Sequence, residues 1–582
     1  MVFPTIEFAV FFLVVMALSW ALMPRPRLWK PFMLTASYFF YGYTDARFVL
    51  LIVASTLVNQ TAAGAIARRR AAASRPSTRR RHPDRRPGRH APGSGILAAA
   101  IVADLGLLGW FKYYGFFALS VDRTLDQLGL GAPLPLLQVA LPIGISFFTF
   151  QALSYVIDVW RGDAAPARLI DFAVYEAFFP HLVAGPIVRA REFIPQLASP
   201  RDPAAVPATR AVFLICGGLV KKVVLADLLA RRLVDPVFDT PGQHSSVEVL
   251  VAIYGYAVQI YCDFSAYSDI AIGIALLLGF RFPDNFDRPY AATSLREFWR
   301  RWHLTLSRWL RDYVYVPLGG GRRGPRRTQL NLLITMVLGG LWHGAAWTFV
   351  CWGALHGAGL AAERSLAGRR ARRRPRVPQS EPTAAAPVAA PVPVAAVPGA
   401  AGGPTTAAVP ATAAVPATAA VPGTAGVAAG AGVAAGSRAA VIPLPRRGGD
   451  LAAPASTVRP AAIMSTPPGS TARRWARRIA TFHLVCAAWV LFRSPDLTTA
   501  GEILRRLLTG GLTVGLVTPT VLVAIVVGLG LAAVPARWWA TAQEAFDQLR
   551  LPIQALAVTA FLLVMYSFVG QQDVAPFIYF RF

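Results

Sequence analysis

The chain has 582 residues, of which 55% are hydrophobic and only 15% are charged, so apolar side chains far outnumber the charges that coat a soluble protein. This composition excludes an ordinary soluble globular protein. The 58 Lys and Arg residues exceed the 30 Asp and Glu residues and give a formal net charge of +28. Because the positive charges cluster beside apolar runs, they indicate a membrane surface as the partner and not a nucleic acid.

Apolar segments that are long enough to cross a membrane recur along the chain. A helix that crosses about 30 Å of hydrocarbon needs roughly 20 apolar residues. By that measure the predicted spans are 6–23, 31–44, 46–67, 94–119, 136–160, 209–230, 247–280, 328–362, 479–493, 513–535 and 552–570. The sequence therefore predicts an all-α polytopic transmembrane bundle of about ten or more spans, some of them broken or re-entrant. The first span has no basic segment before it and no evident cleavage site, so we expect it to be retained.

Lys and Arg residues in the loops predict the orientation, because positive loops tend to stay in the cytoplasm. Arg25, Arg27 and Lys30 follow the first span, and an Arg-dense loop at 68–89 follows the third. Both loops are cytoplasmic if the N-terminus lies outside. The same rule places the basic loop at 322–327 in the cytoplasm.

Residues 367–472 begin with a basic run and continue as an Ala/Pro/Val-rich stretch with the repeat VPATAAVPATAAVP. Prolines interrupt a helix, and such a segment lacks the large side chains that build a core. We therefore predict a disordered cytoplasmic linker. It separates a transmembrane core at 1–366 from C-terminal transmembrane helices at 473–582 that complete the same fold.

The apolar part of segment 328–364 is too long for one span, about 50 Å at 1.5 Å per residue, and Arg clusters flank both ends. Two half-helices, broken near 339–344, explain both facts and place His343 at a break inside the membrane. Backbone broken at that depth must be buried in protein or line a wet cavity. A neutral imidazole there either takes a proton from a hydroxyl nucleophile or hydrogen-bonds a neighbouring helix. His356 points elsewhere on a continuous helix, and we expect it to be structural.

Segment 292–316 predicts one amphipathic helix that starts at a capping box of Ser294 and Glu297. His303 lies on the border between its two faces. Such a helix is typical of a membrane interface, where the basic face either meets lipid headgroups or attracts the phosphates of an acyl-coenzyme A donor. The apolar face carries Trp299, Trp302, Leu306, Trp309, Leu310 and Tyr313, and the basic face carries Arg300, Arg301, Arg308 and Arg311.

Two further segments carry polar residues inside apolar sequence. Asp263, Tyr267 and Asp269 lie in the first half of the span at 247–280, where they either line a polar tunnel or hydrogen-bond neighbouring helices. The segment 178–189 contains two prolines and a glycine and predicts an irregular turn. The cysteines are scattered singly and the histidines have no HxxxH-type spacing, so neither a disulfide framework nor a metal site is predicted.

Five segments carry distinctive motifs: FFPHLVAGPIVR at 178–189, QIYCDFSAYSDIAIG at 259–273, FRFPDNFDRPY at 280–290, EFWRRWHLTLSRWLRDYVYVPLGG at 297–320 and LGGLWHGAAWTFVCWGALHG at 338–357. Together and in this order, they resemble the membrane-bound O-acyltransferase family and in particular its bacterial alginate O-acetyltransferase branch. The C-terminal APFIYFRF is also similar to the ending of that branch.

The resemblance implies a tunnel that joins a cytoplasmic donor side to an outer acceptor side, with His343 as the essential catalytic residue and His303 as a second, auxiliary one. The candidate tunnel-lining residues are Asp263, Tyr267, Asp269, Trp342 and Trp347. The implied activity is the transfer of acetyl from cytoplasmic acetyl-coenzyme A across a bacterial plasma membrane for O-acetylation of an exported polysaccharide. No permanently bound cofactor is implied, and an extracytoplasmic SGNH-type acetyltransferase is the implied partner.

Two alternatives remain open. A related branch transfers D-alanine or another acyl group from a carrier protein to a teichoic-acid-like or lipid acceptor. A transporter or flippase shares the broken helix and the buried charges. A transporter built from inverted repeats would carry a second copy of the 328–364 pattern, and the sequence shows none.

Overall fold

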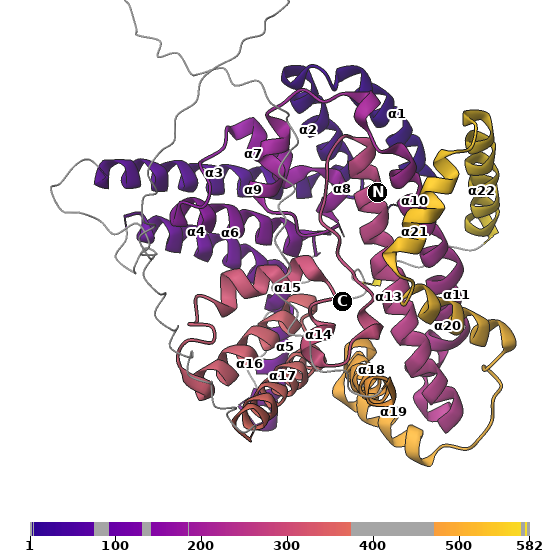
Figure 1. Ribbon diagram of the computed structural model, residues 1–582. Coiled ribbons are helices and arrows are strands. Elements are labelled where there is room, and N and C mark those ends of the chain that lie inside the picture. The colour runs from indigo at the N-terminus through magenta and orange to yellow at the C-terminus, as the bar shows by residue number, and fades with distance from the viewer. Residues whose placement is uncertain are drawn as a thin grey trace, which may run out of the picture. The chain divides into compact units, whose positions relative to one another are not determined.

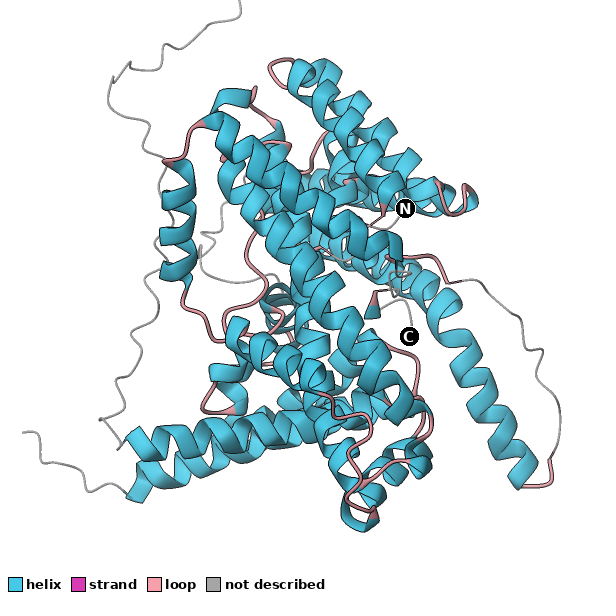
Figure 2. Ribbon diagram, turned by 90° about the vertical axis from the view of Figure 1, so that its right-hand side faces the viewer, coloured by secondary structure: helices cyan, strands magenta, loops and turns pink. Residues whose placement is uncertain are grey.

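The computed structural model of the protein describes residues 3, 5–74, 92–130, 141–183, 185–373, 471–571 and 577–578. These residues form helices and connecting loops, and none of them lies in a strand (Figure 2). The all-α prediction is therefore confirmed. Most of the predicted linker, at 374–470, and most of the Arg-dense loop, at 75–89, lie outside the described residues.

Long helices occur where the apolar segments predicted them (Figure 1). The predicted span at 136–160 becomes helical only at Ile145 within the described residues, and the span at 94–119 continues through a π-helical turn, Gly109–Tyr113, to Gln127. The helices that match predicted spans are α1 (Ile6–Leu22), α2 (Pro26–Gly42), α3 (Arg47–Ala73), α4 (Ser94–Leu108) with α5 (Tyr114–Gln127), α6 (Ile145–Arg161), α10 (Ala208–Leu219), α13 (Ser246–Leu277), α16 (Gly324–His343) with α17 (Trp347–Arg373), α18 (Thr471–Arg493), α20 (Pro519–Leu531) and α22 (Leu551–Gln571).

Shorter helices connect the long ones, and some of them lie inside predicted segments. Two of the shorter helices are amphipathic and lie in the C-terminal part, α19 (Leu497–Thr509) and α21 (Ala536–Asp547). The others are α7 (Leu169–Ala177), α8 (Phe179–Leu182), α9 (Ala190–Phe193), α11 (Asp227–Leu229), α12 (Asp235–Asp239), α14 (Leu295–Phe298) and α15 (Leu304–Leu310). Between α8 and α9 the described backbone is irregular, as the 178–189 segment predicted.

Four helices of the described residues are long and apolar enough to cross a membrane, and two more are apolar but shorter. The polytopic membrane prediction is therefore confirmed. The remaining predicted spans correspond to helices that are shorter or more polar. The four long helices are Arg47–Ala73, Ser94–Gln127, Ser246–Leu277 and Leu551–Phe568, and the two shorter ones are Ile6–Leu22 and Pro519–Leu531.

Helix α13 forms the centre of the packing. It begins at a capping box in which Ser245 Oγ accepts from Glu248 N at 3.1 Å, and Glu248 Oε2 accepts from Ser245 N at 3.1 Å. The helix is apolar on all sides and nearly all of it is buried, as such a helix must be. Helices α10, α18, α19 and α20 pack on it (Figure 1), so the C-terminal helices and residues 1–374 form one unit.

Helices α16 and α17 form a tight antiparallel hairpin because glycines let their backbones approach (Figure 1). A Cβ atom at Gly353 would lie 2.4 Å from the carbonyl O of Met336, and one at Gly340 would lie 2.2 Å from that of Phe349. The turn is 344–346, directly after His343. The structure therefore has a turn beside His343, as predicted, but α16 and α17 have 20 and 27 residues and are not half-helices.

The prediction of one continuous helix over 292–316 is wrong. Ser294 Oγ does cap α14 by accepting from Glu297 N at 3.1 Å, but the chain leaves the helix at Trp299 and begins α15 only after His303. His303 has a left-handed backbone, with φ 43°. Backbone pairing with segment 285–287 fixes this turn, since Asp287 N donates to Arg301 O and Leu304 N to the carbonyl O of Asn285, both at 2.9 Å.

Candidate active site

His343 lies at the end of α16, in an enclosure made almost entirely of aromatic rings. Its side chain is buried, with 3% of the residue exposed. The imidazole centroid is 4.9 Å from the ring of Trp342, 5.2 Å from that of Trp352 and 5.2 Å from that of Phe492. Helices α16, α17 and α18 each supply one of these walls, so the enclosure needs the C-terminal helices as well as the hairpin.

Lys112 and Tyr113 hold the end of α16 from the π-helical turn between α4 and α5. Lys112 Nζ donates to the carbonyl O of Trp342 at 2.6 Å and to that of His343 at 3.3 Å. Tyr113 OH donates to Leu341 O at 2.6 Å. These donors satisfy carbonyl groups that the helix end leaves without intrahelical partners. Our sequence interpretation missed both residues, although a lysine inside an apolar span signals a buried partner.

His303 lies on the other side of Trp342, with 0% of the residue exposed. Its ring is 5.8 Å from the ring of Trp342 and meets that of Phe264 edge-on at 4.7 Å. Nδ1 lies 3.1 Å from Asn285 Oδ1, an acceptor, so the proton is on Nδ1 and Nε2 carries a lone pair. Nε2 has no hydrogen-bond partner among the described residues. A strained backbone and a buried acceptor without a partner are both costly, which favours a functional role.

His356 joins the same cluster. Its Nδ1 accepts from Trp299 Nε1 at 3.3 Å, and its ring is 4.8 Å from that of Trp352, which also contacts His343. The expectation that His343 and His356 point in different directions assumed one continuous helix. The turn at 344–346 folds α17 back against α16, so the two imidazoles share one tryptophan.

The four arginines predicted to bind a donor are divided by the turn at His303. Arg300 is exposed, and Arg301 pairs with Glu297 at 2.8 Å and Asp287 at 3.7 Å. Arg308 is half-buried, and Arg311 pairs with Asp312 at 2.7 Å. They therefore do not form one continuous basic face.

Three other arginines, which we did not single out in the sequence, gather beside Asp312. Arg189 pairs with Asp312 at 2.9 Å, and the guanidinium groups of Arg161 and Arg189 lie 5.1 and 5.3 Å from the ring centroid of Tyr313. With Arg191 they line a cavity of about 150 Å³, and Asp158, Asp163 and Asp312 line it as well. Arg189 ends the segment 178–189, and that motif was the available signal.

The predicted tunnel-lining residues do not share one space. Trp342 contacts both His303 and His343. Trp347 is 53% exposed and packs on Phe116, outside the histidine cluster. Asp269 pairs with Lys221 and lines a separate cavity.

Asp263 and Tyr267 belong to a buried charged centre on α13. Lys222 Nζ lies 2.7 Å from Asp263 Oδ1 and 2.8 Å from Asp227 Oδ1, and all three residues are at most 3% exposed. Asp263 Oδ2 also accepts from the backbone N–H of Ile578 at 2.8 Å. The ring of Tyr267 is 4.1 Å from that of Phe577. These contacts support the alternative reading for both residues, in which they bind neighbouring segments. Within the described ranges, no group of three or more His, Cys, Asp or Glu side chains is arranged to hold a metal ion.

Comparison with known proteins identifies the domain that contains the histidines. Residues 161–390 match the model of "MBOAT, membrane-bound O-acyltransferase family". This interval holds the five motif segments and His303, His343 and His356. The resemblance to this family is therefore confirmed.

Relatives with curated names are similar to part of the chain. A protein of Azotobacter vinelandii named "Probable alginate O-acetylase AlgI" is 43% identical over 338 residues, which are 57% of this chain and 63% of the relative. The "Peptidoglycan O-acetyltransferase" of Helicobacter pylori is 34% identical over 367 residues, 58% of this chain and 64% of the relative. The "Teichoic acid D-alanyltransferase" of Streptococcus thermophilus is 32% identical over 230 residues, 38% of this chain and 55% of the relative. The chain thus spans less than two thirds of the length of each of these relatives.

Proposed function

We propose, from the membrane-bound O-acyltransferase domain that the chain carries at 161–390, that this protein is an O-acyltransferase with His343 as its catalytic residue. The observation that carries the proposal is the position of His343. It ends α16 inside an aromatic enclosure, and Trp342 contacts both its ring and that of a second buried histidine, His303. An aromatic enclosure excludes water, and this favours acyl transfer to a chosen hydroxyl over hydrolysis.

In the proposed reaction, a ring nitrogen of His343 takes the proton of an acceptor hydroxyl as its oxygen attacks the acyl carbonyl carbon. The new C–O bond forms and the thioester C–S bond breaks. The imidazolium then returns the proton to the departing thiolate, so that the free thiol leaves and the histidine is neutral again. His303 Nε2, an acceptor without a partner in the described structure, accepts a hydrogen bond from a second donor group of the acceptor molecule and so orients it.

We propose acetyl-coenzyme A as the donor and an exported polysaccharide as the final acceptor. Two relatives have names that place an acetyl group on a glycan polymer, alginate or peptidoglycan. Half-buried Arg308 supplies a cation for the phosphates of the donor. The cavity of Arg161, Arg189 and Arg191 is less suited to them, because Asp158, Asp163 and Asp312 line it as well. The protein would work in the bacterial plasma membrane with its N-terminus outside, and an extracytoplasmic acetyltransferase of the SGNH type would receive the acetyl group.

The test is His343→Ala in cells that produce the polymer, with base-released acetate per polymer and protein level as readouts. Because a positioned base contributes about 10²–10⁴-fold, we expect acetylation to fall at least 100-fold at normal protein level. The matched control is His483→Ala, since His483 lies in apolar helix α18, is exposed and contacts none of the three clustered histidines. Normal acetylation by the His343 variant would overturn the proposal.

The second candidate is the transfer of D-alanine or another acyl group from a carrier protein to a teichoic-acid-like or lipid acceptor. Its support is the relative named teichoic acid D-alanyltransferase, which is 32% identical. Inverted membrane vesicles supplied with either labelled acetyl-coenzyme A or a labelled aminoacyl carrier protein separate the two. Transfer from the carrier protein alone would favour the second candidate.

A further inference from the structure

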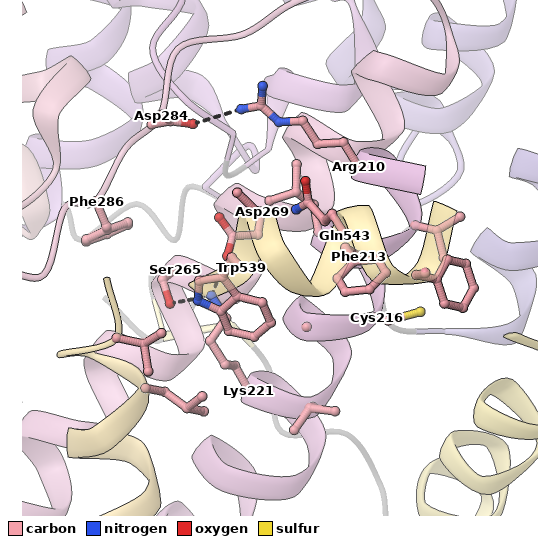
Figure 3. Close-up of a pocket in the computed structure, with 18 of the residues that line it drawn as sticks. Arg210, Phe213, Cys216, Lys221, Ser265, Asp269, Asp284, Phe286, Trp539 and Gln543 are labelled. Carbon is pink, nitrogen blue, oxygen red and sulfur yellow. Dashed lines mark hydrogen bonds and ion pairs between the residues drawn. The ribbon is translucent and has the colours of Figure 1, made fainter. Parts of the chain in front are cut away.

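A cavity of about 730 Å³ lies beside α13, between the N-terminal core and the last three helices. One wall is α10, the π-helical segment Val220–Ala226 and α13, and the other is the end of α20 with α21 and α22 (Figure 3). Its volume falls within the ~300–1,000 Å³ that is typical of small-molecule sites. The proposed acyl transfer does not use this cavity.

Most of the cavity wall is apolar, and the helices on its outer side are the ones that face lipid. Helix α22 is apolar enough to cross a membrane, yet only 6% of its residues between Leu551 and Phe568 are buried inside the protein. On α21, Trp538 is 62% exposed and Trp539 is 41% exposed. Exposed tryptophans on an amphipathic helix are typical of the membrane–water interface. The cavity therefore lies where an interfacial helix meets a membrane-spanning one, and a bilayer lipid can reach it.

The opposite side of the cavity is charged but balanced. Three cations, Arg210, Lys221 and Arg288, face it, and so do three carboxylates, Asp269, Asp284 and Asp287. Each cation is paired with one of these carboxylates: Lys221 with Asp269, Arg210 with Asp284 at 3.7 Å and Arg288 with Asp287 at 3.1 Å. Figure 3 shows Lys221, Ser265 and Asp269 together on this side, with Trp539 across from them. An anionic ligand needs an excess of positive charge, which this lining lacks.

We propose that this cavity binds one zwitterionic phospholipid of the surrounding bilayer. The phosphate lies against Lys221 and Arg210, the ammonium group lies against Asp269 and Asp284, and an acyl chain follows the apolar wall between Phe213 and Phe561. A zwitterion brings one charge of each sign and so matches a lining in which cations and carboxylates alternate. The proposal does not depend on the acyltransferase activity.

The chain segment that closes the charged side also reaches the histidine cluster. Asp284, Phe286, Asp287 and Arg288 line the cavity, whereas Asn285 between them points away and binds His303 Nδ1. The ring of Phe286 is 5.0 Å from that of Trp302. Segment 284–288 therefore borders both the proposed lipid site and the candidate active site, and it separates one from the other.

A larger side chain at Gly217 would fill part of the cavity. Gly217 lines the cavity on α10, and a Cβ atom at this position would meet no atom within 4 Å. Gly217→Leu therefore places a side chain in the cavity without a backbone clash, and replacing glycine in a helix favours folding. The matched control is Gly106→Leu, because Gly106 lies in apolar α4, is exposed and also has nothing within 4 Å of an added Cβ.

The experiment is native mass spectrometry of the full chain, released from nanodiscs that contain equal amounts of phosphatidylethanolamine and phosphatidylglycerol. We expect the wild type and Gly106→Leu to retain one phosphatidylethanolamine, and Gly217→Leu to retain at least fivefold less. We also expect the double variant Lys221→Gln/Asp269→Asn, which removes both charges of one pair, to lose the preference for phosphatidylethanolamine. Equal retention by Gly217→Leu, a wild-type preference for phosphatidylglycerol, or no retained lipid would each overturn the proposal.

Discussion

Replacing Gly353 by alanine should displace His343 without touching it. A Cβ atom at Gly353 would lie 2.4 Å from Met336 O and 2.9 Å from Val337 Cα. Ordinary contact begins at 3.4 Å, so α16 must retreat from α17 by about 1 Å, since backbone atoms cannot turn aside. Such overpacking costs about 1–3 kcal/mol of stability. Because a misplacement of about 1 Å can cost about 100-fold in rate, we expect activity to fall by that order.

The assay is the rate of acetyl transfer per folded protein, with folded protein measured by size-exclusion chromatography of a fluorescent fusion. The control is Gly368→Ala on the same helix, where an added Cβ meets nothing within 4 Å. We expect this control to keep wild-type activity. If Gly353→Ala is folded and as active as the control, the close packing of α16 on α17 does not position His343, and our reasoning about the hairpin is wrong.

Three further predictions concern groups around the cluster. Lys222→Met leaves two carboxylates buried without their cation, so we expect a loss of about 3–5 kcal/mol, visible as a lower midpoint of thermal unfolding in detergent, and an unchanged midpoint would contradict the buried pairing. Asn285→Ala removes the partner of His303 Nδ1 and should lower kcat about tenfold or more with little change in the donor KM; a pure KM effect would refute the positioning role. Arg308→Ala should raise the KM for acetyl-coenzyme A, whereas Arg300→Ala, at an exposed position, should leave this KM unchanged. Equal effects of the two substitutions would mean that both arginines act only through the overall surface charge, and would contradict a specific role of Arg308.

Hydrophobic segments predicted most of the long helices, because each long helix carries its own signal. The break beside His343 was predictable for a physical reason: the apolar stretch from 328 to 362 is longer than a bilayer is thick, and glycines mark the place where it folds. Ser294 caps its helix as the local pattern predicts, because its side chain binds a backbone N–H in its own first turn, but the Glu297 side chain binds Thr293 instead of completing the predicted capping box.

The parts that could not be predicted depend on contacts between distant residues. Local pattern favours one helix over 292–316, but Asn285 and its neighbours bind the backbone there and turn the chain at His303. Lys112 reaches the carbonyl groups of Trp342 and His343 across more than two hundred residues. The large cavity beside α13 likewise needs α21 to pack against α10 and α22 to pack against Val220–Ala226, and no local sequence signal predicts these pairings.

The most direct test of the proposed function is transfer of labelled acetyl from acetyl-coenzyme A by the purified full chain in proteoliposomes. Wild type is compared with His343→Ala at equal amounts of folded protein, in the presence of a competent acceptor. We predict that the wild type transfers label and that the variant is at least 100-fold slower, as expected for loss of a general base. Equal rates for the two proteins would contradict the assignment of His343 as the catalytic residue.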